Sequence, residues 1–182
     1  KYRLPRDVLD GEVKRILELG VDLRLNTKVD DVLETKKTGG FDAVFLAVGA
    51  HIAKRAYIPA GEAAKIMDAV QVLRGMEDVE KPLLGRRVVV YGGGNTAIDV
   101  ARTAKRLGAE EAMIVYRRTR EKMPAHDFEV QDALEEGVLI KWLSTITEAG
   151  EGAITVERME LDDKGVPQPT GEFETLETDS VV

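Results

Sequence analysis

The sequence of 182 residues predicts an α/β fold, in which a parallel sheet with helices is followed by a small antiparallel β-meander. An apolar run ending at Tyr91 leads into three glycines, an amphipathic helical pattern and a second apolar run, which is the order of a β-α-β unit. From Ala153 on, alternating stretches flank the turn-rich segment 162–172 and predict a β-hairpin or meander. Together these observations define the fold class.

Periodicity predicts the elements before the glycines. Helical spacing of apolar residues predicts a helix over 6–20. Alternation predicts a strand over Val21–Leu25, and the nearly all-apolar run Phe41–Ala50 predicts a strand buried on both faces. A second helix is expected over Ala63–Met76, and the polar segment 77–87 reads as a connector.

Further elements are expected between the β-α-β unit and the meander. Residues 126–137 carry apolar side chains near one helical face, and residues 138–143 are typical of another strand. Trp142 lies in that expected strand and is predicted to be a core residue rather than part of a site.

Composition excludes several classes of function. With 43% hydrophobic and 32% charged residues the chain is typical of a globular protein, and its net charge of -7 argues against general nucleic-acid binding. No apolar run is long enough to span a bilayer, so no membrane partner is expected. The absence of cysteine excludes disulfides, iron–sulfur ligands and a thiol nucleophile within this chain, and it fits a cytoplasmic protein. With two histidines, no metal site is predicted.

Neither end of the sequence is typical of a complete protein. The first residues, KYRLPRDVLD, are charged and interrupted by proline, so they do not predict a signal peptide. There is no initiator Met, and Val182 lies inside an apolar run. We therefore expect the chain to be a piece of a longer protein.

The glycine turn has the spacing of a dinucleotide-binding motif. The six residues fit G-x-G-x-x-A: Gly92, Gly93, Gly94, Asn95, Thr96 and Ala97. In this motif the first glycine makes a tight turn, the second admits a pyrophosphate, and the small third residue lets the helix pack on the strand. The free N–H groups and the dipole at the helix start favour a phosphate. Because the motif sits in a strand–turn–helix–strand order, it predicts a Rossmann-like nucleotide site; the alternative is a structural turn without ligand.

Two arginines follow the second strand. In an NAD site this place is usually held by an acidic residue that binds the ribose 2′-hydroxyl. Here Arg117 and Arg118 hold it, and guanidinium groups pair with a 2′-phosphate through charge-assisted hydrogen bonds. The sequence therefore favours NADPH over NADH. The alternative is a solvated charged loop; Arg120 and Lys122 are weaker candidates on the same segment.

No side chain is predicted to act as a catalytic acid, base or nucleophile. Asp99, one turn into the glycine-flanking helix, is expected to be structural rather than functional. His126 clusters with Asp127 and Glu129, but acidic residues at the start of a helix explain this cluster better than catalysis does. The roles of Asp99, Arg120 and His126 stay open at this point.

Four blocks, taken together and in order, resemble a known family. They are YRLPRDVLDGEVKRILELGVDLRLNTKV, FDAVFLAVGA, VVVYGGGNTAIDVARTAKRLGA and VYRRTREKMPA. They resemble the small subunit of NADPH-dependent glutamate synthase and related oxidoreductases that use FAD and NAD(P)H, including the flavin and NADPH portion of dihydropyrimidine dehydrogenase. The resemblance covers nearly the whole chain.

The resemblance implies two nucleotide-binding domains. Residues 1–76 would belong to a partial FAD-binding-type domain, and residues 77–182 to an NAD(P)H-binding Rossmann domain that is truncated at its C-terminal end. Gly92 to Thr96 would form the pyrophosphate turn, Arg117 and Arg118 the 2′-phosphate pair, and Gly49 a strand end near FAD. The parent protein would pass hydride from NADPH to FAD, and electrons would then reach an electron-accepting subunit or a fused iron–sulfur domain.

Several parts of the family pattern are missing from the chain. They are the N-terminal FAD fingerprint, the cysteine-bearing iron–sulfur segment, the C-terminal Gly-Asp stretch over the flavin and the turn after Val182 beside the nicotinamide. The isolated chain is therefore expected to bind FAD weakly and to be inactive. Sheet edges left unpaired by the missing parts are compatible with a homodimer.

Two other classes of function fit parts of the sequence. A non-catalytic nucleotide-binding or assembly module would use the same turn, and turnover with an FAD-bearing partner would separate it from an enzyme. A plain NADP-dependent dehydrogenase would need a substrate pocket and a proton-relay residue, which the sequence does not clearly offer.

Overall fold

The computed structural model describes residues 3–49, 57–62, 64–76 and 80–182. Contacts between residues divide the chain into two compact units, Lys1–Val48 and Gly49–Val182. Each unit is described by itself below, because the arrangement of the two is not determined.

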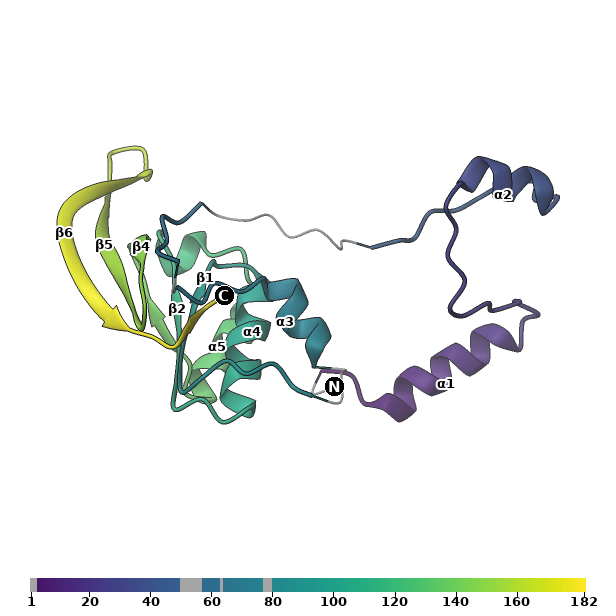
Figure 1. Cartoon of the computed structure of the whole chain (residues 1–182), viewed down its shortest axis with the longest axis horizontal. Helices are drawn as coiled ribbons and strands as arrows, with labels where there is room; N and C mark the ends of the chain where they lie inside the picture. Colours follow the sequence, from purple (N-terminus) through teal and green to yellow (C-terminus); the bar gives the residue numbers. More distant parts are fainter. Residues whose placement is uncertain (1–2, 50–56, 63, 77–79) are drawn as a thin grey trace. The chain divides into compact units, whose positions relative to one another are not determined.

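A parallel sheet forms the centre of the second unit (Figure 1). Its strands lie in the order β3-β2-β1-β7 and all neighbours are parallel. Their bounds are Arg87–Tyr91 for β1, Glu111–Val115 for β2, Leu139–Lys141 for β3 and Ser180–Val181 for β7. The predicted β-α-β unit is therefore confirmed, and β1 has a strand on each side.

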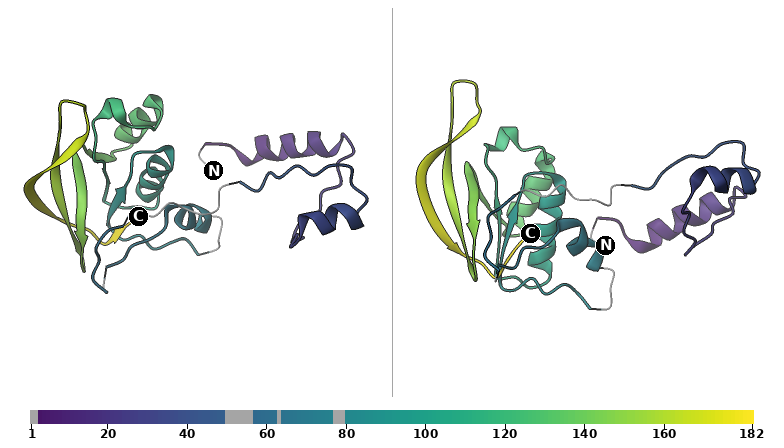
Figure 2. Two further views of the ribbon diagram at one scale, coloured as in Figure 1. Left: turned by 90° about the horizontal axis from the view of Figure 1, so that it is seen from above. Right: turned by 45° about the horizontal axis from the view of Figure 1, so that its top comes forward.

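Three helices cover one face of this sheet (Figures 1 and 2). They are α3 (Ala69–Gly75), α4 (Asn95–Arg106) and α5 (Asp127–Glu135). Val88 and Val90 of β1 belong to the core beneath them, together with Ile98 and Ala101 of α4, whose side chains have no exposed surface. The apolar face of α4 thus fixes the helix on the strand that leads into the glycine turn.

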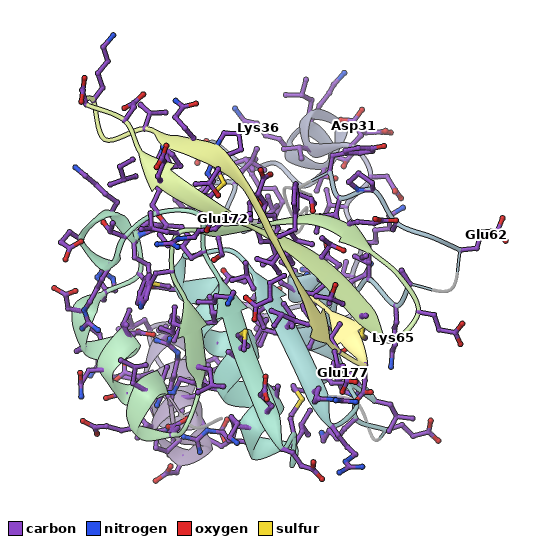
Figure 3. The ribbon with its side chains drawn as sticks, turned by 90° about the vertical axis from the view of Figure 1, so that its left-hand side faces the viewer. Asp31, Lys36, Glu62, Lys65, Glu172 and Glu177 are labelled. Atoms are coloured by element: carbon purple, nitrogen blue, oxygen red, sulfur yellow. The ribbon has the colours of Figure 1, made fainter. Side chains whose placement is uncertain are left out.

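An antiparallel sheet covers the other face. It consists of β4 (Ser144–Ala149), β5 (Ala153–Leu161) and β6 (Pro167–Glu177), in the order β4-β5-β6. Val89 of β1 packs in a second core cluster with Ile154 and Val156 of β5. Figure 3 looks onto this sheet, with Glu172 and Glu177 labelled on β6. The predicted meander is confirmed, and β4 is a strand that the sequence did not predict.

Residues before α4 differ in part from expectation. The helix expected over Ala63–Met76 begins only at Ala69, because the Asp68 carboxylate caps it by accepting a hydrogen bond from the Gln71 N–H at 3.0 Å. The preceding residue Met67 instead donates its N–H to the Val181 carbonyl at 2.7 Å, next to β7. The residues around α3 thus pack within the second unit. The division into an FAD-binding-type domain over 1–76 and an NAD(P)H-binding domain over 77–182 stays a prediction.

The strand expected over 138–143 is shorter than predicted. Strand β3 ends at Lys141, and Trp142 lies between β3 and β4. The Trp142 side chain is partly buried against the first core cluster and makes an edge-to-face contact with Tyr116, with ring centroids 6.3 Å apart.

Among the described residues of the first unit, two segments are helical. The predicted helix is present as α1 (Arg6–Leu17), and a second, unpredicted helix α2 (Val32–Thr38) is capped by Asp31, whose carboxylate accepts the Leu33 and Glu34 N–H groups. Neither helix buries a residue. No helix among the residues placed by the structure is both long enough and apolar enough to cross a bilayer.

The two strands expected in the first unit are wrong. Residues 21–25 and 41–49 form no strand, and Ala50 lies outside the described residues. The run expected to be buried on both faces is exposed, with Phe45 at 90% and Leu46 at 63% of full exposure. A strand needs a neighbour for its backbone groups, and none of the described residues supplies one here.

Candidate functional site

The glycine turn lies at the carboxyl end of β1, where the strand order changes direction. Strand β1 has β2 on one side and β7 on the other, although these strands are far apart in sequence. In open α/β sheets, ligands bind in the crevice at such a switch point, outside the carboxyl ends of the strands. Tyr91 and Val115 are paired in register, so the turn after β1 lies beside the segment after β2.

The first residue of the turn, Gly92, has the backbone conformation that the motif requires. Its φ of 153° lies outside the usual range of other residues, and its N–H donates to the Val115 carbonyl at 3.2 Å. A Cβ at Gly92 would lie 3.7 Å from the Ala97 Cβ, and Ala97 is buried at 7% exposure. A small residue at position 97 therefore lets α4 pack closely, as predicted.

The other two glycines differ in their surroundings. A Cβ at Gly93 would overlap the ring of Tyr116, whereas a Cβ at Gly94 would meet nothing within 4 Å. Gly93 thus serves packing within the protein. The open space at Gly94 is where a ligand can approach the backbone.

The glycine turn contains backbone N–H groups that make no hydrogen bond within the described residues. The Ala97 and Ile98 N–H groups both donate to the Gly94 carbonyl, at 2.9 and 3.2 Å. The N–H groups of Gly94, Asn95 and Thr96 have no acceptor among the residues that the structure describes. Because these donors lie at the positive end of the α4 dipole, the turn can hold an anion.

Arg117 and Arg118 follow β2 directly after Tyr116. Arg117 is exposed and Arg118 is partly buried. In the described part of the chain neither guanidinium has an ion pair, whereas five other arginines of the unit do: Arg86, Arg87, Arg102, Arg106 and Arg158. The Nε of Arg118 is buried without a hydrogen-bond partner in the described residues. Such an orphan donor is rare, and an anion would satisfy it.

The segment after the arginines folds back onto the glycine turn. It contains the short 3₁₀ helix η1 (Arg120–Lys122). The Tyr116 hydroxyl donates to the Lys122 carbonyl at 2.6 Å, the Ala125 N–H to the Gly93 carbonyl at 3.1 Å, and the His126 N–H to the Asn95 Oδ1 at 3.0 Å. The sequence analysis did not identify Tyr116 as a site residue. It could have been found as the aromatic residue directly before the two arginines, since an aromatic ring can pack on a glycine that has no side chain, here Gly93.

The η1 turn carries mixed charge. The pKa of Glu121 lies below its ordinary value, chiefly because of a hydrogen bond with the Thr119 side chain and also because of Arg120 and Lys122 nearby. The Glu121 carboxylate is therefore ionised at neutral pH and offsets part of the positive charge of Arg120 and Lys122.

Gly49 and the His126 side chain are the next candidates from the sequence; the His126 backbone N–H contacts the turn through Asn95. Gly49 has a positive φ of 69°, and the residues directly after it are outside the described part of the chain. The exposed ring of His126 stacks on Phe128 with centroids 5.7 Å apart. No group of three or more metal-ligating side chains occurs within residues 3–49, 57–62, 64–76 and 80–182.

A parallel sheet with a glycine turn at its switch point defines a nucleotide-binding Rossmann fold. The chain belongs to the pyridine nucleotide-disulphide oxidoreductase family, which matches residues 6–182.

Named relatives place the chain more closely within this family. It is 42% identical over 94% of its length to the NADP(+)-dependent formate dehydrogenase subunit beta of Moorella thermoacetica. It is 37% identical over 100% of its length to the NADPH-Fe(3+) oxidoreductase subunit beta of Geobacter sulfurreducens. It is 32% identical over 93% of its length to the glutamate synthase [NADPH] small chain of Escherichia coli. The resemblance to the glutamate synthase small subunit is thereby confirmed.

The chain spans 27%, 29% and 39% of the lengths of these three relatives. Among solved structures, a 2-naphthoyl-CoA reductase complex matches 92% of this chain and 23% of its own, with a TM-score of 0.69 and 20% identity. This likeness supports the fold.

Proposed function

We propose that the chain is the NADPH-binding portion of a flavin-dependent oxidoreductase that passes hydride from NADPH to FAD. The relatives named above are subunits of NADP- and NADPH-dependent enzymes, and each is much longer than this chain. In this proposal residues 77–182 form the NAD(P)H-binding domain and residues 1–76 part of an FAD-binding-type domain, to which Gly49 belongs.

The residues present fit NADPH. The open space at Gly94 and the unpaired N–H groups of Gly94, Asn95 and Thr96 would hold the pyrophosphate. Gly92, Gly93 and Ala97 give the turn its shape, as their backbone and packing indicate. NADPH, when bound, supplies the hydride, and the protein contributes binding and orientation.

Two unpaired arginines carry the proposal. Arg117 and Arg118 lie at the end of β2, where a 2′-phosphate is bound in NADP sites, and neither has a carboxylate partner in the described part of the chain. Arg102 of the same unit is, by contrast, paired with Glu136. A dianionic phosphate would supply the charge that these two lack.

The parent protein would pass electrons on to an electron-accepting subunit or a fused iron–sulfur domain.

We propose further that the isolated chain is inactive and located in the cytoplasm, and that a homodimer through sheet edges is compatible with its fold. Pro167 and Pro169 interrupt the donors along the β6 edge, and on β4 the N–H and carbonyl of Ala149 are already bonded to Pro59 and Gly61.

Calorimetric titration with NADPH and NADH tests the cofactor. We expect the wild-type chain to bind NADPH at least tenfold more tightly, because hydrogen bonds to charged groups contribute about 1.5–3 kcal/mol each. Changing Arg117 and Arg118 to Ala should abolish this preference. A matched control with Arg86 and Arg158 changed to Ala removes the same charge from paired sites and should keep it.

Equal binding of both nucleotides by the wild-type chain would contradict the proposed preference. Loss of preference in both double variants would show that net charge, rather than the position of Arg117 and Arg118, determines it.

A further inference from the structure

We propose that Asn95 is a positioning residue for the NADP preference, because it holds the arginine-bearing segment 117–126 against the glycine turn. This inference rests on the proposed function. It assigns Asn95 a role different from the one its sequence position suggests, since a residue at the start of α4 is expected to face the pyrophosphate.

The side-chain oxygen of Asn95 is engaged within the protein. Its Oδ1 accepts the His126 N–H at 3.0 Å, across 31 positions of sequence. A carbonyl oxygen is an acceptor only, so this atom cannot bind a phosphate oxygen. The hydrogen bond therefore contributes to the shape of the site rather than directly to the ligand.

The same segment is held at further points, one of them at Arg118 itself, whose carbonyl accepts the Leu143 N–H at 3.2 Å. The Ala125 N–H donates to the Gly93 carbonyl at 3.1 Å, one residue before the Asn95 contact. At the other end, the Tyr116 hydroxyl donates to the Lys122 carbonyl, and the Tyr116 ring fills the space over Gly93. In sequence, Arg117 and Arg118 lie between the two residues joined by this bond, Tyr116 and Lys122.

These contacts join the two parts of the nucleotide site into one unit. The pyrophosphate would sit on the backbone at 94–96 and the 2′-phosphate on the arginines, so the distance between the two phosphate sites depends on how the segment is held. A segment fixed before binding loses less conformational entropy when the ligand arrives. The backbone of Asn95 lies in the pyrophosphate turn, and its side chain bonds the arginine-bearing segment. Changing this side chain should therefore affect 2′-phosphate recognition through the position of the segment.

A matched pair of ligands isolates this effect. Adenosine 2′,5′-bisphosphate and adenosine 5′-monophosphate differ only in the 2′-phosphate. The ratio of the dissociation constant of the monophosphate to that of the bisphosphate, measured by calorimetry on the 182-residue chain, therefore reports 2′-phosphate recognition alone, and a larger ratio means stronger recognition. A purely structural role of Asn95 would change both constants by the same factor and leave the ratio unchanged.

We expect Asn95→Ala to lower this ratio about fivefold, the size of one side-chain hydrogen bond. Asn95→Asp retains an oxygen that accepts the His126 N–H, so it should keep the ratio even if its charge weakens both ligands. Thr96→Ala, at the same helix start but without a recorded side-chain contact to the segment, should change both constants equally.

If Asn95→Ala fails to fold, Tyr116→Phe carries the test, because it removes only the hydroxyl that holds Lys122 and should also lower the ratio. An unchanged ratio in the folded variant would overturn the positioning role. A wild-type chain that does not prefer the bisphosphate would instead overturn the proposed NADP preference, and the positioning role with it. The two failures are thus distinguishable.

Discussion

Two apolar stretches of this chain differ in structure and in burial, although both are rich in hydrophobic residues. Arg87–Tyr91 forms β1, with a parallel strand on each side, and its three valines are 1–3% exposed. Residues 41–49 form no strand, and Phe45, Leu46 and Val48 are 63–90% exposed. Side-chain hydrophobicity is comparable, so the difference lies in the neighbours that each stretch finds.

A strand is stable only when its N–H and C=O groups are paired and its side chains are covered. For β1, strands β2 and β7 pair the backbone, α4 covers one face and β5 the other. Among the residues described in the first unit there is no strand at all to pair with 41–49. Stability in this chain should therefore be concentrated in the second unit.

The largest expected effect comes from the core beneath α4. Ile98 has 0% exposure, so Ile98→Ala should lower the free energy of unfolding by about 2–5 kcal/mol. Phe45→Ala, in the exposed stretch, should change it by less than about 0.5 kcal/mol although it removes a larger side chain. Fluorescence of Trp142, the single tryptophan, follows urea unfolding of the second unit.

Trp142 reports on the second unit alone. Circular dichroism should therefore also follow the unfolding of the Phe45 variant, to detect any loss of stability in the first unit. A loss of stability there comparable to that of Ile98→Ala would contradict the contrast between the two stretches.

A smaller effect should distinguish two neighbouring glycines at the end of β1. A Cβ at Gly93 would overlap the Tyr116 ring, so Gly93→Ala should cost about 1–3 kcal/mol through overpacking. Gly94→Ala meets open space at a φ of -87° and should leave stability almost unchanged. It should nevertheless weaken NADPH binding, because the added methyl group occupies the approach to the backbone. Unfolding and calorimetry of both variants check this, and equal losses of stability would contradict it.

The smallest effect concerns pH and the start of β1. The Asp179 carboxylate accepts the N–H groups of Arg86 and Arg87, at 2.6 and 2.8 Å, which lowers its pKa below the ordinary value. A lowered pKa stabilises the folded state above the unfolded value of about 3.9, and this contribution is lost as pH falls through the folded pKa.

Asp179→Asn keeps an oxygen acceptor but no titrating group. Its stability should fall less steeply between about pH 5 and pH 2 than that of the wild-type chain. Urea unfolding at several pH values, followed through Trp142, measures both slopes. Identical slopes would mean that Asp179 has no part in the acid sensitivity of the sheet.

Local sequence determined the parts of this protein whose cause is local. The glycine turn requires Gly92 at positive φ and a small residue at 97, and both requirements are visible in a short motif. Helix α4 and the meander follow from periodicity. The pair Arg117 and Arg118 could be found because its place relative to the second strand is fixed by chain order alone.

Tertiary structure decided what depends on distant partners. It left 21–25 and 41–49 without strand neighbours, it bonded the Met67 N–H to the Val181 carbonyl just before the Asp68 cap of α3, and it engaged Asn95 with His126. Periodicity records which side chains are apolar, but not whether a second strand lies alongside or which backbone N–H comes within reach. Those outcomes depend on long-range hydrogen bonds and packing, which no short window of sequence contains.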